Sequence, residues 1–102
     1  MPLSLPALKE LIRKEENVLF VKEGCPYCTK ALARADELKR QGVIKDYLVQ
    51  TLNKDFNDET LGKLVQDFGG QKHVHWGKAT KPQIFMNGEY VGDSMAFDEY
   101  SG

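Results

Sequence analysis

Two cysteines, Cys25 and Cys28, are separated by Pro26 and Tyr27, and the 102-residue chain has two cysteines in all. A pair this close in sequence cannot join distant parts of a chain, so the spacing indicates chemistry and not a structural framework. Two thiols within reach of each other suit thiol–disulfide exchange, because one can attack a substrate sulfur and the other can resolve the mixed disulfide. We therefore predict a redox function for this pair.

The residues beside the pair assign different roles to its two thiols. The apolar, β-branched run 18–21 predicts a buried strand, and Pro26 is suited to begin a helix. An exposed Cys25 would then face the unpaired N–H groups and the positive end of the helix dipole, which favour the thiolate, and Lys22 adds a cation. Cys28, one helical turn further on, would be less exposed and less ionised. We expect Cys25 to be the nucleophile and Cys28 the resolving thiol.

A metal site is the alternative interpretation of the same cysteines. Together with His73 and His75, Cys25 and Cys28 compose a Cys2His2 set, which is a known zinc format. Against this, one residue separates the histidines, whereas zinc sites usually place about three to five between them. A proline and an aromatic residue inside the cysteine pair also suit a redox motif better. We favour the redox interpretation and expect no bound metal.

Periodic apolar positions predict the elements that hold the pair in place. The signals are helical spacing of leucines and alanines, N-capping residues and glycines that end helices. In chain order, we predict an N-terminal helix within 1–16 capped by Ser4, a strand over 18–21, a helix from Pro26 that ends before Gly42, a strand over 46–51, and a helix capped by Asp58 that ends before Gly69.

The last third of the chain carries one strong local signal. Residues 83–86 and 89–91 flank Asn87 and Gly88, a pairing that favours a tight β-hairpin, and a short capped segment follows over 94–100. We expect residues 71–80 to form a loop. Within that loop, Trp76 either contacts a partner at the rim of the site or folds back over the edge of the core.

The order of these elements predicts the fold class. Strands that alternate with helices favour a parallel pair, and the hairpin adds antiparallel strands. We therefore expect an α/β protein with a four-stranded mixed sheet and helices on both faces. The length predicts a single domain over residues 1–102.

Composition excludes several classes of partner. The chain has 14 Lys and Arg against 15 Asp and Glu and a formal net charge of −1, so we expect it to bind neither nucleic acid nor an anionic membrane surface. No apolar run reaches the length of an export signal or a membrane helix. We expect a cytoplasmic monomer in a reducing environment.

At the cysteine pair, the sequence resembles the glutaredoxins of the dithiol class, whose active site reads Cys-Pro-Tyr-Cys. Lys22 stands three residues before the first cysteine, as in that family, and 80–82 matches its Thr-x-Pro motif. Val91 and Gly92 match the start of its Ile-Gly-Gly motif. The resemblance extends from about residue 17 to about residue 98.

This resemblance implies a thioredoxin-like fold and glutathione-dependent reduction of protein disulfides and glutathione mixed disulfides. Glutathione would be a co-substrate whose glycine carboxylate meets Lys22 and whose sulfur lies near Tyr27. The backbone of Lys81 would pair with its cysteinyl segment like an added strand, and Pro82 would follow a cis peptide bond. Disulfide-bonded or glutathionylated proteins are the implied partners, with ribonucleotide reductase as one candidate. Some members share an iron–sulfur cluster between two chains, but proline after the first cysteine generally accompanies catalysis.

Two departures from the family pattern affect glutathione binding. After Gly92, residues 93–96 stand where the family has a second glycine and an aspartate, so either the aspartate is replaced or two extra residues move it to Asp98. In both cases we expect Ser94 to cap a helix whose N–H groups receive the γ-glutamyl carboxylate. Lys81 stands where an apolar residue is common, either as an exposed lysine or as a cation for a ligand carboxylate. With Lys22, it would make the site locally positive despite the balanced net charge.

Overall fold

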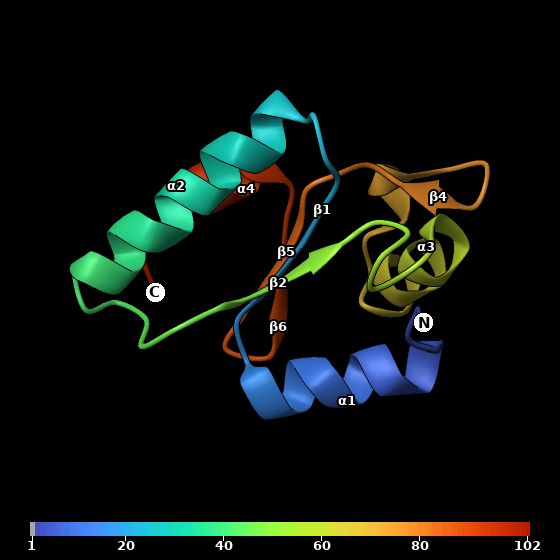
Figure 1. Cartoon of the computed structure of the whole chain (residues 1–102), viewed down its shortest axis with the longest axis horizontal. Coiled ribbons are helices and arrows are strands. Elements are labelled where there is room, and N and C mark those ends of the chain that lie inside the picture. Colours follow the sequence, from blue (N-terminus) through green and yellow to red (C-terminus); the bar gives the residue numbers. More distant parts are fainter. Residues whose placement is uncertain (1) are drawn as a thin grey trace.

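A four-stranded mixed sheet forms the centre of the computed structural model, which describes residues 2–102 (Figure 1). In spatial order, its strands are β2 (Leu48–Thr51), β1 (Val18–Val21), β5 (Gln83–Met86) and β6 (Glu89–Gly92). Strand β1 pairs in parallel with β2 and antiparallel with β5, and β5 pairs antiparallel with β6. This arrangement confirms the predicted α/β class with a mixed sheet.

Helices cover both faces of this sheet, as the sequence predicts. Helices α2 (Pro26–Arg40) and α4 (Ser94–Asp98) pack together over one face, and α1 (Leu5–Glu15) and α3 (Asp58–Asp67) pack together over the other (Figure 1). Each face has its own cluster of buried apolar side chains. Burial of these side chains is the main favourable contribution to folding.

Strand β1 contributes to both clusters because successive side chains of a strand point to opposite faces. Leu19 and Val21 pack toward α2 and α4, and Val18 and Phe20 pack toward α1 and α3. All four are buried. The buried strand that the sequence predicts before the cysteine pair is therefore confirmed.

Side chains cap the N-termini of the helices, and one of the predicted caps is wrong. The Ser4 hydroxyl accepts the Ala7 N–H, as predicted for α1. At α3, however, Asn57 is the cap and accepts the Thr60 N–H at 3.0 Å. The predicted cap, Asp58, is already the first helical residue, because Asn57 has the extended backbone of a cap.

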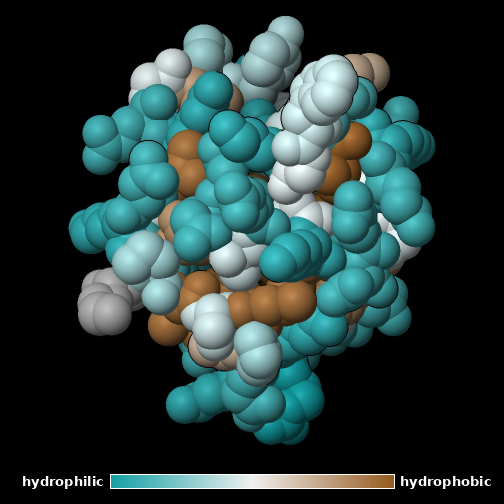
Figure 2. Space-filling view, turned by 90° about the vertical axis from the view of Figure 1, so that its right-hand side faces the viewer, coloured by the Kyte–Doolittle hydropathy of each residue, from teal (hydrophilic) through white to brown (hydrophobic). Residues whose placement is uncertain are grey.

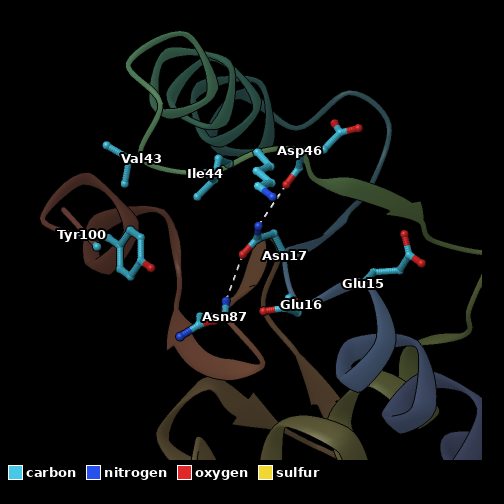
Figure 3. Close-up of a pocket in the computed structure, with 10 residues that line it drawn as sticks. Glu15, Glu16, Asn17, Val43, Ile44, Asp46, Asn87 and Tyr100 are labelled. Atoms are coloured by element: carbon cyan, nitrogen blue, oxygen red, sulfur yellow. Dashed lines mark hydrogen bonds between the residues drawn. The ribbon is translucent and has the colours of Figure 1, made fainter.

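Asn17 connects three segments at the start of β1, the end of the strand away from the cysteines (Figure 3). Its Nδ2 donates to the Asp46 carbonyl and its Oδ1 accepts the Asn87 N–H, both at 2.9 Å. Asp46 precedes β2 and Asn87 lies in the turn between β5 and β6. A hollow of about 610 Å³ around Asn17 is thus at the opposite end of β1 from the cysteines.

The structure differs from the sequence prediction over residues 71–80. The expected loop contains a short 3₁₀ turn, η1 (Gln71–His73), followed by strands β3 (Val74–His75) and β4 (Lys78–Ala79), which pair antiparallel. We call residues 74–79 the ribbon. Strand β2 also begins at Leu48, two residues after the predicted start. Within residues 2–102, no helix has both the length and the apolar character needed to cross a membrane.

Candidate active site

The two cysteines lie where β1 leads into α2. Cys25 is the N-cap of α2 with an extended backbone, and Pro26 is the first helical residue, as the sequence predicts. The Cys28 backbone N–H donates to the Cys25 Sγ at 3.3 Å. A helix N-terminal N–H aimed at a sulfur favours its thiolate, because the unpaired N–H groups carry the positive end of the helix dipole.

Both thiols are buried, although the sequence predicts burial for Cys28 alone. Cys28 is 2% exposed, in agreement with its expected place inside the helix, but Cys25 is also buried, at 7%. The reason is the segment before β5, which comes against Cys25 so that its thiol donates to the Lys81 carbonyl across 3.8 Å. The expectation of an exposed Cys25 is therefore wrong, and its sulfur is reached from the edge of a hollow.

The pKa of the Cys28 thiol is raised to about 12, mainly by burial and also by a hydrogen bond to Cys25 and by the charge of Cys25. A backbone hydrogen bond at Lys22 acts in the opposite direction. Cys28 therefore keeps its proton at neutral pH.

The segment over 80–82 closes the other side of the site. The Lys81–Pro82 peptide bond is cis, which confirms what the resemblance implies. The buried amide of Gln83 donates to the carbonyl and the hydroxyl of Thr80, at 2.9 and 3.0 Å, and its oxygen accepts from Tyr90. These hydrogen bonds fix the segment against the sheet.

Two separate hollows flank the thiols. The first, of about 310 Å³, is lined by both cysteines together with Lys22 and Lys54, and we call it the thiol hollow. The second, of about 410 Å³, runs between the start of α2 and the ribbon, and we call it the groove. The groove is lined by Tyr27, Lys72, His73, His75, Thr80, Lys81, Pro82, Asp93, Ser94 and Met95.

The predicted glutathione contacts are divided between these hollows. Lys22 lines the thiol hollow, whereas Tyr27, Lys81, Pro82 and Ser94 line the groove. Gly92 is buried at the end of β6 and is absent from the lining of both hollows.

Lys81 is not the free cation that the sequence suggests. Its ammonium group pairs with the Asp58 carboxylate at the start of α3, and its side chain is 9% exposed. The expectation of an exposed lysine, or of a cation available to a ligand, is wrong because α3 supplies an acidic partner. Lys22 and Lys54 are the cations beside the thiols.

Asp93, and not Ser94, caps α4. The Asp93 carboxylate accepts the Ala96 N–H at 3.1 Å, whereas Ser94 is the first helical residue and is buried. The other carboxylate oxygen lies 3.9 Å from Nδ1 of His73. Because Asp93 already occupies the Ala96 N–H, this N–H is not available to a ligand carboxylate, contrary to our expectation for Ser94.

The residues of the proposed zinc set do not come together. His73 and His75 line the groove, whereas Cys25 and Cys28 line the thiol hollow. Within residues 2–102, no three His, Cys, Asp or Glu side chains form a group that could hold a metal ion.

Three residues near the site were missed from the sequence. Asp93 could have been found, since aspartate is a preferred N-cap and a helix was expected to follow it. The sequence predicts Asp58 only as a helix cap, because its pairing with Lys81, 23 positions away, has no local signal. Lys54 enters the thiol hollow from the segment after β2, which also has no signal in the sequence.

A comparison with protein-family models matches residues 17–91 to the glutaredoxin model. The chain belongs to the glutaredoxin family. The match begins just before β1 and ends within β6, so it contains the cysteine pair and the cis-proline segment. As a member of this family, the chain is an oxidoreductase.

Known glutaredoxins are similar to this chain in sequence and in fold. Glutaredoxin-1 of Rhizophagus irregularis is 29% identical over 85 residues, which cover 83% of this chain and 72% of the relative. The crystal structure of oxidized glutaredoxin 2 from Chlamydomonas reinhardtii has a TM-score of 0.64 at 20% identity, over 91% of this chain and 77% of the other. A buckwheat glutaredoxin–glutathione complex has a TM-score of 0.61 at 22% identity, over 90% and 73%. The fold of this glutaredoxin is thioredoxin-like, as the resemblance implies.

Proposed function

We propose that this glutaredoxin is a glutathione-dependent oxidoreductase that reduces protein disulfides and glutathione mixed disulfides. Cys25 is the nucleophile and Cys28 the resolving thiol. The observation that supports these roles most directly is the contrast between the two sulfurs: Cys25 Sγ accepts a backbone N–H at the start of α2, whereas burial holds the proton on Cys28.

Reduction of a glutathione mixed disulfide needs Cys25 alone. The Cys25 thiolate attacks the glutathione sulfur, a disulfide forms between them, and the substrate leaves as its thiolate. A glutathione thiolate then attacks the glutathione sulfur on Cys25, so glutathione disulfide forms and the Cys25 thiolate returns. Two glutathione molecules, one of them already in the substrate, leave as one disulfide. The Cys28 N–H stabilises the Cys25 thiolate both as attacker and as leaving group.

Reduction of a protein disulfide uses Cys28 as well. Cys25 attacks one substrate sulfur, and Cys28 then attacks Cys25 to release the second substrate thiol and leave a Cys25–Cys28 disulfide. The charge and the hydrogen bond of Cys25 both raise the Cys28 pKa. In the mixed disulfide Cys25 carries no charge, so its charge no longer raises the Cys28 pKa at the step in which Cys28 attacks.

For glutathione, we propose a position across the rim between the two hollows. Lys22 and Lys54 would bind a carboxylate beside Cys25, and Tyr27 would lie along the tripeptide. Within residues 2–102, no backbone carbonyl accepts the N–H of Lys81, the residue before Pro82. This N–H would donate to the cysteinyl segment of glutathione. The buckwheat glutaredoxin–glutathione complex supports this proposal at the level of the fold.

A comparison of electron donors tests the proposal. The protein would be given a glutathione mixed disulfide of a small thiol, with either glutathione and glutathione reductase or a thioredoxin reductase system. We expect turnover with glutathione and little with thioredoxin reductase. Turnover that depends on thioredoxin reductase would instead indicate a thioredoxin-like activity.

A further inference from the structure

Charge is distributed unevenly along this chain. None of the 15 acidic residues lies within 68–88, whereas three of the 14 Lys and Arg and both histidines do. This segment builds the ribbon and one side of the groove. Lys81 is neutralised by Asp58, but Lys72 and Lys78 are exposed and make no ion pair within residues 2–102. The segment that builds the ribbon is therefore basic although the whole chain is nearly neutral, and the acidic residue that faces it across the groove is Asp93.

Trp76 stands at the tip of the ribbon and is 100% exposed. Its φ is +56°, in the left-handed region, which bulky side chains rarely adopt and which asparagine, aspartate or glycine would adopt at lower cost. Neither the turn nor the core therefore accounts for a tryptophan at this position. A fully exposed indole at a strained position suits contact with another molecule.

The ribbon holds this tryptophan in a fixed place. A Cβ on Gly62 of α3 would lie 2.1 Å from the Gly77 carbonyl oxygen, so the backbone of the tip packs directly against the helix. Ala79 is buried at 2% and Val74 packs against the same core cluster. Because both strands are anchored in this way, Trp76 projects into solvent without a flexible loop behind it.

The ribbon continues into the groove, whose lining includes Lys81, the residue whose carbonyl accepts from the Cys25 thiol. His75, next to Trp76, lines the groove, and so does Tyr27, which lies inside the cysteine pair. Tyr27 and Met95 are also largely exposed, at 61% and 76%. Figure 2 shows the side of the molecule on which α3 and the ribbon lie, where apolar patches are interspersed with polar side chains. A chain that reacts at Cys25 can therefore extend past the position proposed for glutathione and along the ribbon toward Trp76.

We propose that the ribbon docks an extended, acidic segment of the protein substrate beside its reacting cysteine. Trp76 packs on the segment, and Lys72 and Lys78 pair with its carboxylates. The proposal rests on the function proposed above, because the docked segment is that of a disulfide-bonded or glutathionylated protein. It gives the enzyme a preference among protein substrates that a small disulfide does not experience.

Two glutathionylated peptides of equal length test this preference, one with Asp and Glu on both sides of its cysteine and one with Lys there. Neither peptide contains tryptophan. At an ionic strength of about 0.01 M, we expect kcat/KM to be about tenfold higher for the acidic peptide, and the difference to disappear at about 1 M. Equal kcat/KM values at low salt, or a preference for the basic peptide, would overturn the proposal.

Charge reversal and truncation locate the surface. We expect Lys78→Glu to lower kcat/KM for the acidic peptide by about three- to tenfold, and Trp76→Ala by about tenfold. Lys45→Glu makes the same charge change at the far end of β1, beside Asn17, and should have no effect. None of the three variants should alter turnover of the small mixed disulfide. Equal losses in Lys78→Glu and Lys45→Glu would show that net charge, and not the ribbon, sets the preference.

Fluorescence separates docking from catalysis. Trp76 is the one tryptophan of the chain, so its emission reports on the ribbon without a label. In the Cys25→Ser variant, which cannot react, we expect the acidic peptide to change this emission saturably and the basic peptide to leave it unchanged. If the small mixed disulfide is not turned over, the proposed function fails, and this titration still decides whether the ribbon binds acidic segments. No response to the acidic peptide would overturn docking.

Discussion

Cys25 and Cys28 are both buried, yet their polar surroundings differ. The Cys25 sulfur accepts a helix N-terminal N–H and lies across from the Lys81 carbonyl, whereas Cys28 lies within the first turn of α2, where burial dominates. Exposure therefore does not separate their proposed roles. The direction of the hydrogen bond between them does, because the N–H of Cys28 points to the sulfur of Cys25 and stabilises negative charge there.

The raised pKa of Cys28 predicts a loss of stability at alkaline pH. In the unfolded chain the thiol ionises near about pH 8.5, whereas in the folded protein its pKa is about 12. Between these values the folded state holds a proton that the unfolded state has lost, so the free energy of unfolding falls as pH rises. Below about pH 8, both states hold the proton and this group adds no pH dependence.

Urea denaturation of the reduced protein measures this effect. Between about pH 9 and about pH 10.5, we expect the wild type to lose about 1 kcal/mol per pH unit more than Cys28→Ala. Tyr47, whose pKa is raised to about 12 mainly by its hydrogen bond to Asp36, contributes equally to both proteins and cancels. Parallel declines in the two proteins would mean that Cys28 is not the source.

The ion pair between Lys81 and Asp58 predicts a loss of stability when its carboxylate is removed. Asp58→Asn would leave the Lys81 ammonium enclosed without its counter-charge, so we expect the free energy of unfolding to fall by about 1–3 kcal/mol. Asp46→Asn is the matched control, because Asp46 pairs with Lys39 where both side chains are largely exposed. It should cost at most about 1 kcal/mol. Similar small losses in both variants would show that the buried pair is not special.

Motifs that are contiguous in the sequence predict the residues of the site correctly, whereas contacts between residues far apart in the sequence are not predicted. The cysteine pair and the Thr-x-Pro motif are contiguous, so their place before α2 and before β5 was predicted correctly. The partner of Lys81 lies 23 positions away and depends on how α3 packs against the sheet. No local pattern contains that information.

At the scale of elements, the ribbon is the feature that distinguishes this structure from its prediction. Its strands have two residues each, which is too short for an alternating pattern to appear in sequence. By contrast, the sequence predicts the hairpin of β5 and β6, because asparagine and glycine favour the positive φ that its turn requires. In the structure, Asn87 and Gly88 both have a positive φ. The ribbon makes the same kind of turn with Trp76 and Gly77, and tryptophan there is not a turn signal.

The contact between α3 and the ribbon predicts that alanine in place of Gly62 lowers the free energy of unfolding. A glycine inside a helix is normally improved by alanine, by about 1 kcal/mol. In Gly62→Ala, the new Cβ would meet backbone atoms of Gly77, which cannot rotate away. We therefore expect urea denaturation to show a loss of about 1–3 kcal/mol in the free energy of unfolding, accompanied by a change in Trp76 emission.

The control for this variant is Lys63→Ala, the neighbouring exposed position of α3. It should change stability by less than about 0.5 kcal/mol and leave the Trp76 emission as it is. A Gly62→Ala protein more stable than the wild type would contradict the close packing of the ribbon on α3.

At the scale of the whole molecule, the chemistry lies at one end of the sheet. Strand β1 leads into the segment that carries the thiols, and Asn17 directly precedes the strand, where its hydrogen bonds join the segments before β2 and between β5 and β6. The layered fold was predictable because alternating strands and helices with short connections leave few arrangements. The division of the site into two hollows was not, because it depends on how the 80–82 segment and the ribbon pack beside α2.

Reduction of a small glutathione mixed disulfide by the Cys25→Ser and Cys28→Ser variants, with glutathione as donor, tests the central claim most directly. The account predicts that Cys25→Ser abolishes turnover, because no thiolate remains at the start of α2. Cys28→Ser should retain substantial turnover, since its backbone N–H still faces the Cys25 sulfur and the mixed disulfide is resolved by glutathione. Equal loss in the two variants, or turnover that survives in Cys25→Ser, would contradict it.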